Sequence, residues 1–287
     1  MTATVLGGND LAARIRAETA EVAAELSGRG VLPKLAVVTA TADKASAWYV
    51  RSIATAAGKA GIACDVVDLG KGADPDIIGT TLVDLSAQAE VGGVILATPL
   101  SPGARFGVLA QCIDPAKDID GANPASLGRL VAGLPAFAPA TAEAVVRLLE
   151  YHGVGLTGRH AVVVGRSTVV GKPVAHLLLD RHATVTICHS RTGDLAEITR
   201  TADVLIVAVG HARLITAGHV RPGTIVVDVG TNPTAIGGLA GDVDLAVAEV
   251  AGALTPVPGG VGPVTTALLL EHTVRAVANQ FSVPAER

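Results

Sequence analysis

Residues 160–179, with the sequence HAVVVGRSTVVGKPVAHLLL, could bind the diphosphate of a dinucleotide cofactor. The stretch reads as a strand rich in valine, then a glycine turn, then a helix. Such a site needs one glycine for a tight turn and small residues that let the diphosphate reach the helix N-terminus. Gly165 and Ser167 meet these needs, although the spacing G-x-S-x-x-x-G-K-P differs from the usual G-x-G-x-x-G. The turn therefore predicts a nicotinamide-cofactor site.

The next strand indicates which cofactor would bind. An NAD site places an acidic residue at the end of this strand, where it holds the ribose hydroxyls. Here the strand ends in CHSRT, which supplies Ser190 and Arg191 and no acid, and Arg166 lies beside the turn. Two arginines and a hydroxyl suit a 2′-phosphate, so we expect NADP. The alternative is that both arginines are solvated loop residues.

Two later strands end at glycines, in IVAVG (206–210) and VVDVGTN (226–232). In an open parallel sheet, the nicotinamide lies along the edge where the strands end. We therefore assign Val209, Gly210 and Thr231 to the cofactor, together with Thr265 near the start of the last predicted helix.

Short strands alternate with amphipathic helices, which is typical of βαβ units with parallel sheets. The predicted fold class is α/β, with two α/β domains around a cleft, the second a Rossmann-type NADP-binding domain. A proline- and glycine-containing stretch, 132–144, separates them. We expect one domain at 1–138 plus 267–287, and the other at 139–266. Strands are predicted at 34–40, 62–69, 92–98, 160–165, 183–189, 203–210 and 224–230, and helices at 9–26, 43–60, 74–89 and 265–280.

The composition excludes several classes of function. The chain has 287 residues, 49% hydrophobic and 17% charged, with a formal net charge of −4. Its scattered basic residues predict no nucleic-acid partner, and no apolar run approaches the ~20 residues of a membrane span. The three cysteines are far apart and the eight histidines have no metal-binding spacing, so we expect neither disulfides nor a metal. Without a signal peptide, the expected location is the cytoplasm.

Aromatic residues make up only 2% of the chain, yet Trp48 and Tyr49 are adjacent in ASAWYVRSI (45–53). Farther along stand KDIDGANP (117–124) and TPVPGGVGPVTTALLLEHT (255–273). GRSTVVGKP (165–173) lies between these two motifs. In the order in which they occur along the chain, these motifs resemble those of the methylenetetrahydrofolate dehydrogenase/cyclohydrolase family. The resemblance covers nearly the whole chain.

The resemblance implies a substrate, a tetrahydrofolate one-carbon adduct, and residues that bind it. Tyr49 matches the tyrosine that stacks on the pterin, and Asp120 matches the aspartate that holds the pterin's amino edge. These two are the expected catalytic residues. Pro258, Gly259 and Gly260 match the loop that lines the aminobenzoate. The family also implies a homodimer, and Trp48 then has a packing or dimer role.

At two positions the chain departs from the family pattern. The family has a lysine four residues after the tyrosine, the proton handler of the cyclohydrolase reaction, where this chain has Ile53. The glutamine that supports that lysine is replaced by Ala97. Arg51 stays protonated and is no base, and Lys44 would have to reach back along its helix.

The expected function is therefore NADP-dependent oxidation of 5,10-methylenetetrahydrofolate, or the reverse reaction, with weak or absent cyclohydrolase activity. Hydride transfer depends mainly on positioning, whereas loss of acid–base help typically slows a reaction ~10²–10⁴-fold. Three alternatives stay open: a bifunctional dehydrogenase/cyclohydrolase, a repurposed folate-dependent paralogue, and a catalytically silent folate- or NADP-binding module.

Overall fold

The computed structural model describes residues 2–101, 103–234 and 237–281, and these form two compact units. One unit contains Ala13–Ala140 and the chain from Thr266 onward; we call it the three-stranded unit. The other contains the chain up to Ala12 and Thr141–Thr265; we call it the six-stranded unit. Within the described residues, no helix is long and apolar enough to cross a membrane.

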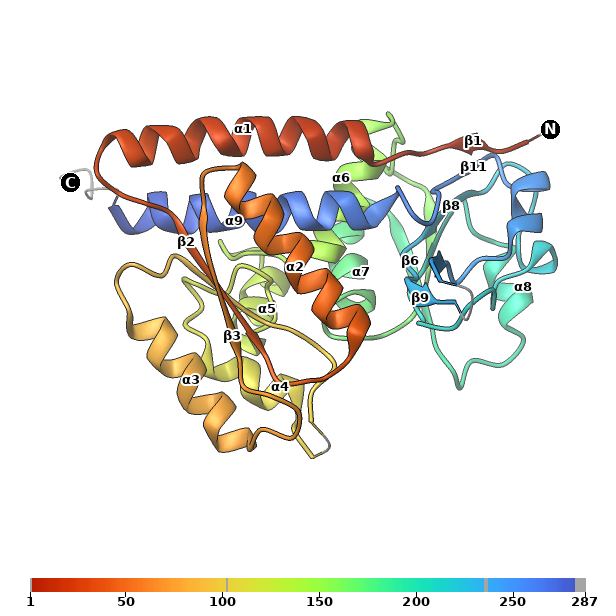
Figure 1. Ribbon diagram of the computed structural model, residues 1–287. Coiled ribbons are helices and arrows are strands. Elements are labelled where there is room, and N and C mark those ends of the chain that lie inside the picture. Colours follow the sequence, from red (N-terminus) through yellow and green to blue (C-terminus); the bar gives the residue numbers. More distant parts are fainter. Residues whose placement is uncertain (1, 102, 235–236, 282–287) are drawn as a thin grey trace. The chain divides into compact units, whose positions relative to one another are not determined.

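The three-stranded unit is built on a parallel sheet in the order β3-β2-β4 (Figure 1). Aspartate side chains cap the N-termini of two of its helices. The Asp43 carboxylate accepts from the N–H of Ser46 at 2.7 Å, and the Asp74 carboxylate accepts from the N–H of Asp76 at 2.9 Å. The strands are β2 Lys34–Thr39, β3 Ala63–Asp68 and β4 Gly93–Leu96. The helices are α1 Asn9–Gly28, α2 Lys44–Lys59, α3 Pro75–Ala87, α4 Phe106–Leu109, a 3₁₀ turn Ala110–Cys112, α5 Pro124–Val131 and α9 Val261–Phe281.

The six-stranded unit is a parallel sheet in the order β1-β11-β8-β7-β5-β6. Figure 1 labels β1, β11, β8 and β6 of this sheet. Its central strands are buried runs of valine, leucine and isoleucine, as a sheet covered on both faces requires. The strands are β1 Thr4–Val5, β5 His160–Val164, β6 Thr184–Cys188, β7 Val204–Val207, β8 Ile225–Asp228 and β11 Ala253–Leu254, with a hairpin of β9 Asn232–Pro233 and β10 Leu239–Ala240. The helices are α6 Ala140–Tyr151, α7 Gly171–Leu179, α8 Leu195–Thr199 and the 3₁₀ turns Ala217–His219 and Leu245–Glu249.

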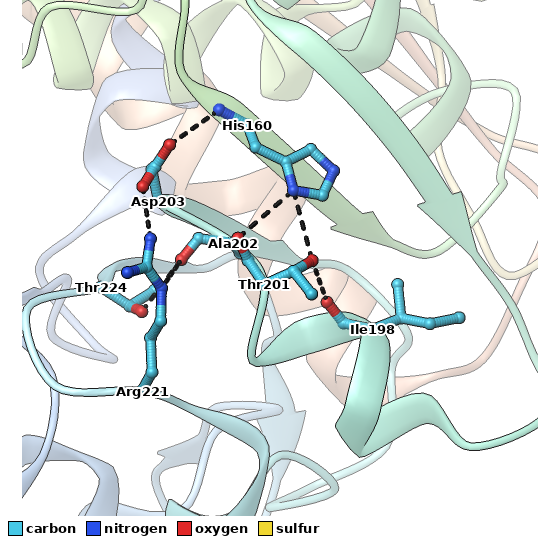
Figure 2. A network of polar contacts seen from close by, with 7 residues as sticks. All are labelled: His160, Ile198, Thr201, Ala202, Asp203, Arg221 and Thr224. Atoms are coloured by element: carbon cyan, nitrogen blue, oxygen red, sulfur yellow. Dashed lines mark hydrogen bonds and ion pairs between the residues drawn. The ribbon is translucent and has the colours of Figure 1, made fainter.

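A polar network ties together the starts of β5, β7 and β8 (Figure 2). The Asp203 carboxylate accepts from the N–H of His160 at 2.9 Å and also pairs with Arg221. The carbonyl of Ala202 accepts from Arg221 Nε and from the Thr224 hydroxyl, both at 3.1 Å. This network occupies the amino edge of the sheet, opposite the edge where the glycine turns lie.

Each predicted strand and helix corresponds to an observed element, but the N-terminus differs from expectation. The sequence analysis places residues 1–138 in one domain, whereas residues up to Ala12 belong to the six-stranded unit. The reason is that β1 pairs with β11, with Thr4 opposite Ala253, so the first residues extend the larger sheet. A two-residue strand has no periodicity that a sequence pattern could reveal. Residues 282–287, which the prediction also assigns to the first domain, lie outside the described residues.

Candidate active site

The glycine turn after β5 is closed so tightly that two of its residues have no space for a side chain. A Cβ on Gly165, whose φ is 133°, would overlap the carbonyl of Ala208 at the end of β7. A Cβ on Gly171, the first residue of α7, would overlap the carbonyl of Gly165. The Ser167 hydroxyl accepts from the N–H groups of Val170 at 3.1 Å and Gly171 at 3.3 Å. The close packing of this turn therefore explains why Gly165, Ser167 and Gly171 are small residues, as the sequence pattern predicts for a tight turn.

The same turn fits a diphosphate group. Arg166 and Ser167 are exposed. In the part of the chain that the structure describes, the main-chain N–H groups of residues 166–169 donate to no protein acceptor. The N-terminus of α7, a nine-residue helix, adds the positive end of its dipole. Free N–H groups at a helix N-terminus are what a phosphate anion binds.

Ser190 and Arg191 lie just beyond the end of β6, the neighbour of β5 in the sheet. The register pairs Val164 with Cys188, so both strands end at the same edge. Ser190 and Arg191 are exposed, and a turn in which the N–H of His189 donates to the Thr192 hydroxyl at 2.8 Å shapes the segment. Among the described residues, neither Arg166 nor Arg191 forms an ion pair. Two free cations at one sheet edge fit a phosphate on the adenosine ribose.

The remaining residues assigned to the cofactor fall in two settings. Val209, Gly210 and Thr231 follow β7 and β8, so they lie at the same carboxyl edge as the glycine turn. Thr265 is buried in α9, where its hydroxyl donates to the carbonyl of Val261 at 3.2 Å. Its hydroxyl is thus bonded within its own helix.

The proline–glycine loop at 258–260 packs closely on the N-terminal residues of the same unit. The N–H of Gly8 donates to the carbonyl of Gly259 at 2.8 Å, and a Cβ on Gly8 would overlap the carbonyl of Gly260. Helix α9 then begins at Val261, four residues before the predicted start. The loop therefore has a structural role in addition to the substrate-binding role predicted for Pro258, Gly259 and Gly260.

The three-stranded unit brings Tyr49 and Asp120 together. Tyr49 lies on α2 with 37% of its surface exposed, and Asp120 is half-buried in the loop before α5. Burial, and secondarily the nearby Asp120 carboxylate, raise the pKa of the Tyr49 hydroxyl. Burial, with a contribution from Asp118, raises the pKa of Asp120 to about 7, while His272 and the N–H of Ala140 partly oppose the shift. An exposed aromatic ring beside a carboxyl whose pKa is raised is an arrangement that suits a flat, hydrogen-bonding ligand.

Two residues that the sequence analysis missed hold the loop that carries Asp120. The Asp118 carboxylate accepts from the N–H groups of Ala122 and Asn123, both at 2.9 Å. His272, fully buried on α9, donates from Nδ1 to the carbonyl of Ile119 at 2.8 Å. The repeated acid in KDID was a signal for Asp118, but nothing in the helix pattern around His272 distinguishes it from a core residue.

The two positions that depart from the family pattern are both buried. Ile53 is 1% exposed on the inner face of α2, which it shares with Ser46, Val50 and Ala57, and Ala97 is 5% exposed. Arg51 is exposed on α2, as is Lys44 at the start of that helix, and Trp48 is 62% exposed. An aliphatic core side chain therefore occupies the position at which the family has its lysine.

Comparisons with known proteins decide the family. Residues 6–120 match the catalytic domain, and residues 139–281 the NAD(P)-binding domain, of tetrahydrofolate dehydrogenase/cyclohydrolase. The chain belongs to this family. It is 60% identical over 278 residues to the bifunctional protein FolD 1 of Rhodococcus jostii, covering 96% of this chain and 94% of the relative.

Solved structures of the family have the same fold. The methylenetetrahydrofolate dehydrogenase-cyclohydrolase of Trypanosoma brucei, complexed with NADP and an inhibitor, is 34% identical with a TM-score of 0.93 and covers 99% of this chain and 100% of its own. A 5,10-methylenetetrahydrofolate dehydrogenase from the silkworm Bombyx mori is 35% identical with a TM-score of 0.90, covering 97% of this chain and 99% of its own. Both family domains are therefore present here, in the order that the motifs predicted.

Replacing Ile53 by lysine should destabilise the protein strongly. Ile53 is fully buried, so an ammonium placed there would be desolvated. We expect Ile53→Lys to lower the free energy of unfolding by ~3–5 kcal/mol, against ~0.5–1.5 kcal/mol for the control Ile53→Val. Urea denaturation followed by circular dichroism measures both. A lysine variant as stable as the valine variant would show that the site admits water or a counter-ion.

Proposed function

We propose that this protein is an NADP-dependent oxidoreductase that converts 5,10-methylenetetrahydrofolate to the methenyl form, or catalyses the reverse reaction. The observation that carries the proposal is the pairing of the exposed Tyr49 ring with the Asp120 carboxyl in the family's catalytic domain. A pterin has a flat face for the ring and a donor edge for the carboxylate. The NADP-bound relative from Trypanosoma supports the choice of cofactor.

Each unit contributes a different part of the reaction. In the three-stranded unit, Tyr49 stacks on the pterin and the Asp120 carboxylate accepts from its amino edge, which fixes the substrate's orientation. In the six-stranded unit, the turn at 165–171 holds the diphosphate of NADP, and Arg166, Ser190 and Arg191 hold its 2′-phosphate. The bound cofactor supplies the hydride acceptor, and the folate's own nitrogens stabilise the cation that forms. The protein's contribution is therefore positioning.

The finer part of the proposal is that methenyl hydrolysis is weak or absent. Hydrolysis needs a group that moves a proton, and the buried Ile53 and Ala97 have none. A second candidate is full dehydrogenase/cyclohydrolase activity, which the name of the bifunctional Rhodococcus relative favours. We further propose that the protein is a homodimer, on the strength of the family resemblance.

A spectrophotometric assay with methylenetetrahydrofolate and NADP tests these proposals. We expect NADPH to form while the methenyl product accumulates at a rate that hydrolysis barely reduces, after correction for uncatalysed ring opening. Prompt loss of the methenyl absorbance would establish the bifunctional enzyme. Binding of both ligands without NADPH formation would contradict the dehydrogenase proposal, and so would turnover with a different substrate only.

Replacing Arg166 by alanine should weaken the binding of NADP much more than the binding of NAD. A charge-assisted hydrogen bond to phosphate contributes ~1.5–3 kcal/mol, which corresponds to about a 10–100-fold change in Kd. Isothermal titration with NADP and NAD measures the ratio, and Arg159→Ala, just before β5 at the opposite sheet edge, is the matched control. Equal losses for the two cofactors would mean that Arg166 does not contact the 2′-phosphate.

Folate use should depend on pH through Asp120. Only the ionised carboxylate accepts the pterin's donor edge, so kcat/KM for the folate should rise about tenfold per pH unit up to about pH 7 and then level off. Asp120→Asn should remove this dependence together with most of the activity, whereas Tyr49→Phe, which keeps the ring, should retain it. A wild-type profile that is flat between pH 5.5 and 8 would contradict the assignment.

The same pKa makes a stability measurement informative. Because the folded pKa of Asp120 lies above its ordinary value, the folded state binds this proton more tightly than the unfolded chain. The stability from this group is present below the ordinary carboxyl pKa of about 4 and is lost as pH rises through about 7. Asp120→Asn should therefore unfold at a higher urea concentration than wild type at pH 8, with the difference decreasing toward pH 4.

A further inference from the structure

A buried carboxylate, that of Asp242, occupies the turn that follows β7. Asp242 is 0% exposed and lies just beyond β10. Its Oδ2 accepts from the N–H of Val209 at 2.7 Å and of Gly210 at 2.9 Å, and its Oδ1 from the N–H of His211 at 2.9 Å. Asn232 Nδ2 donates to the same Oδ1 at 2.9 Å. Four donors match the roughly four acceptor sites of an ionised carboxyl.

Three successive N–H groups that converge on one point form an anion-binding concavity. In a cofactor domain such a concavity, at the carboxyl edge of the sheet, could attract a phosphate. Here the protein's own carboxylate fills it. Among the described residues, no group donates a hydrogen bond to the carbonyls of Val209 and Gly210. These two residues can therefore offer a ligand main-chain acceptors but no main-chain donors. Acceptors suit the NH₂ of a nicotinamide carboxamide and reject a phosphate.

A second buried carboxylate, that of Asp228, holds Asp242 in place. Asp228 ends β8 and accepts from the N–H groups of Gly230 and Asp242, both at 2.9 Å, and of Val243 at 3.0 Å. The Thr255 hydroxyl, just after β11, accepts from the N–H of Asp228 at 2.8 Å. The two carboxylates thus connect the ends of β7 and β8, and the hydrogen bond between the Asp228 N–H and the Thr255 hydroxyl connects the end of β8 to that of β11.

The packing around these carboxylates leaves little freedom. A Cβ on Gly230 would overlap the Asp242 carboxyl, and a Cβ on Gly241 would overlap that of Asp228. Burial, and secondarily the Asp242 charge, raise the pKa of Asp228 to about 6, against the opposing effect of its three N–H donors. Burial is therefore the main obstacle to ionising Asp228, the Asp242 charge adds to it, and the main-chain donors offset it only in part.

We propose that Asp242 is a positioning residue of the cofactor site: by accepting the N–H groups of residues 209–211, it holds this turn in the shape that receives the nicotinamide half of NADP. The inference rests on the proposed function, which places the cofactor at this edge. Asp242 acts through the turn and touches neither reactant.

The experiment compares NADP with 2′,5′-ADP, a fragment that has the 2′-phosphate and the adenosine and lacks the nicotinamide. Asp242→Asn replaces one acceptor oxygen by an NH₂ that opposes the N–H donors. We expect this variant to raise the Kd of NADP at least about tenfold in calorimetric titration, while the Kd of 2′,5′-ADP changes less than twofold. Equal weakening of both ligands, or of neither, would overturn the proposal.

Asp203→Asn is the matched control. Asp203 also accepts a main-chain N–H in the same unit, but at the amino edge of the sheet (Figure 2). The Asp203→Asn variant should leave the ratio of the Kd of NADP to the Kd of 2′,5′-ADP unchanged. A shift in this ratio as large as that caused by Asp242→Asn would overturn the proposal. If Asp242→Asn does not fold, Asn232→Ala removes a single donor to Asp242 and should shift the ratio a fewfold in the same direction; an unchanged ratio would count against the proposal. Wild-type protein that binds neither NADP nor 2′,5′-ADP would instead refute the proposed function.

Discussion

The parallel pairing of the strands imposes one constraint on which the rest of the site depends. In a parallel sheet all strands end at the same edge, and the turns that leave this edge have main-chain groups without sheet partners. In the six-stranded unit, the turns after β5, β6, β7 and β8 all meet this condition. Within the part of the chain that the structure describes, the turn after β5 leaves the N–H groups of residues 166–169 without a protein acceptor, whereas the turn after β7 donates those of residues 209–211 to Asp242. One edge thus offers donors at one turn and acceptors at another, an arrangement that suits a cofactor with an anionic and an amide end.

The three-stranded unit uses the same device with a different outcome. Asp118 anchors its loop by accepting two main-chain N–H groups, as Asp242 does in the larger sheet. The pKa of Asp118 is nevertheless raised, because burial outweighs these bonds. Burial, and secondarily the nearby Asp118, raise the pKa of Asp120 to about 7, because His272 and its main-chain donor, the N–H of Ala140, oppose the shift only in part. A ligand that donates hydrogen bonds to the Asp120 carboxylate would stabilise its charged form. Part of the free energy of binding such a ligand would therefore come from the carboxylate charge, which the protein's own donors stabilise only weakly.

The sequence predicted the elements well wherever periodicity or turn chemistry was present. Gly165 and Ser167 could be assigned because a tight turn before a helix demands a glycine and small residues. β1 could not, since its two residues join the sheet only through β11. Asp242 and His272 were missed for a related reason: each acts on groups more than thirty residues away in the chain. Ile53 was recognised as a departure from the family pattern, but its full burial could be read only from the packing of α2.

The burial of Ile53 separates the two reactions of the family in physical terms. Hydride transfer moves no proton between the protein and the folate, so it depends mainly on orientation, which is the role that we propose for Tyr49 and Asp120. Hydrolysis needs a second group that exchanges a proton with water while the substrate is held. Burial raises the pKa of Asp120 to about 7, but in the proposed complex its carboxylate is ionised and engaged by the pterin edge while the substrate is bound. A carboxylate that accepts the substrate's donors cannot at the same moment act as the proton carrier, and the aliphatic side chain at position 53 has no group for that role, which is the physical basis of the weak hydrolysis that we propose.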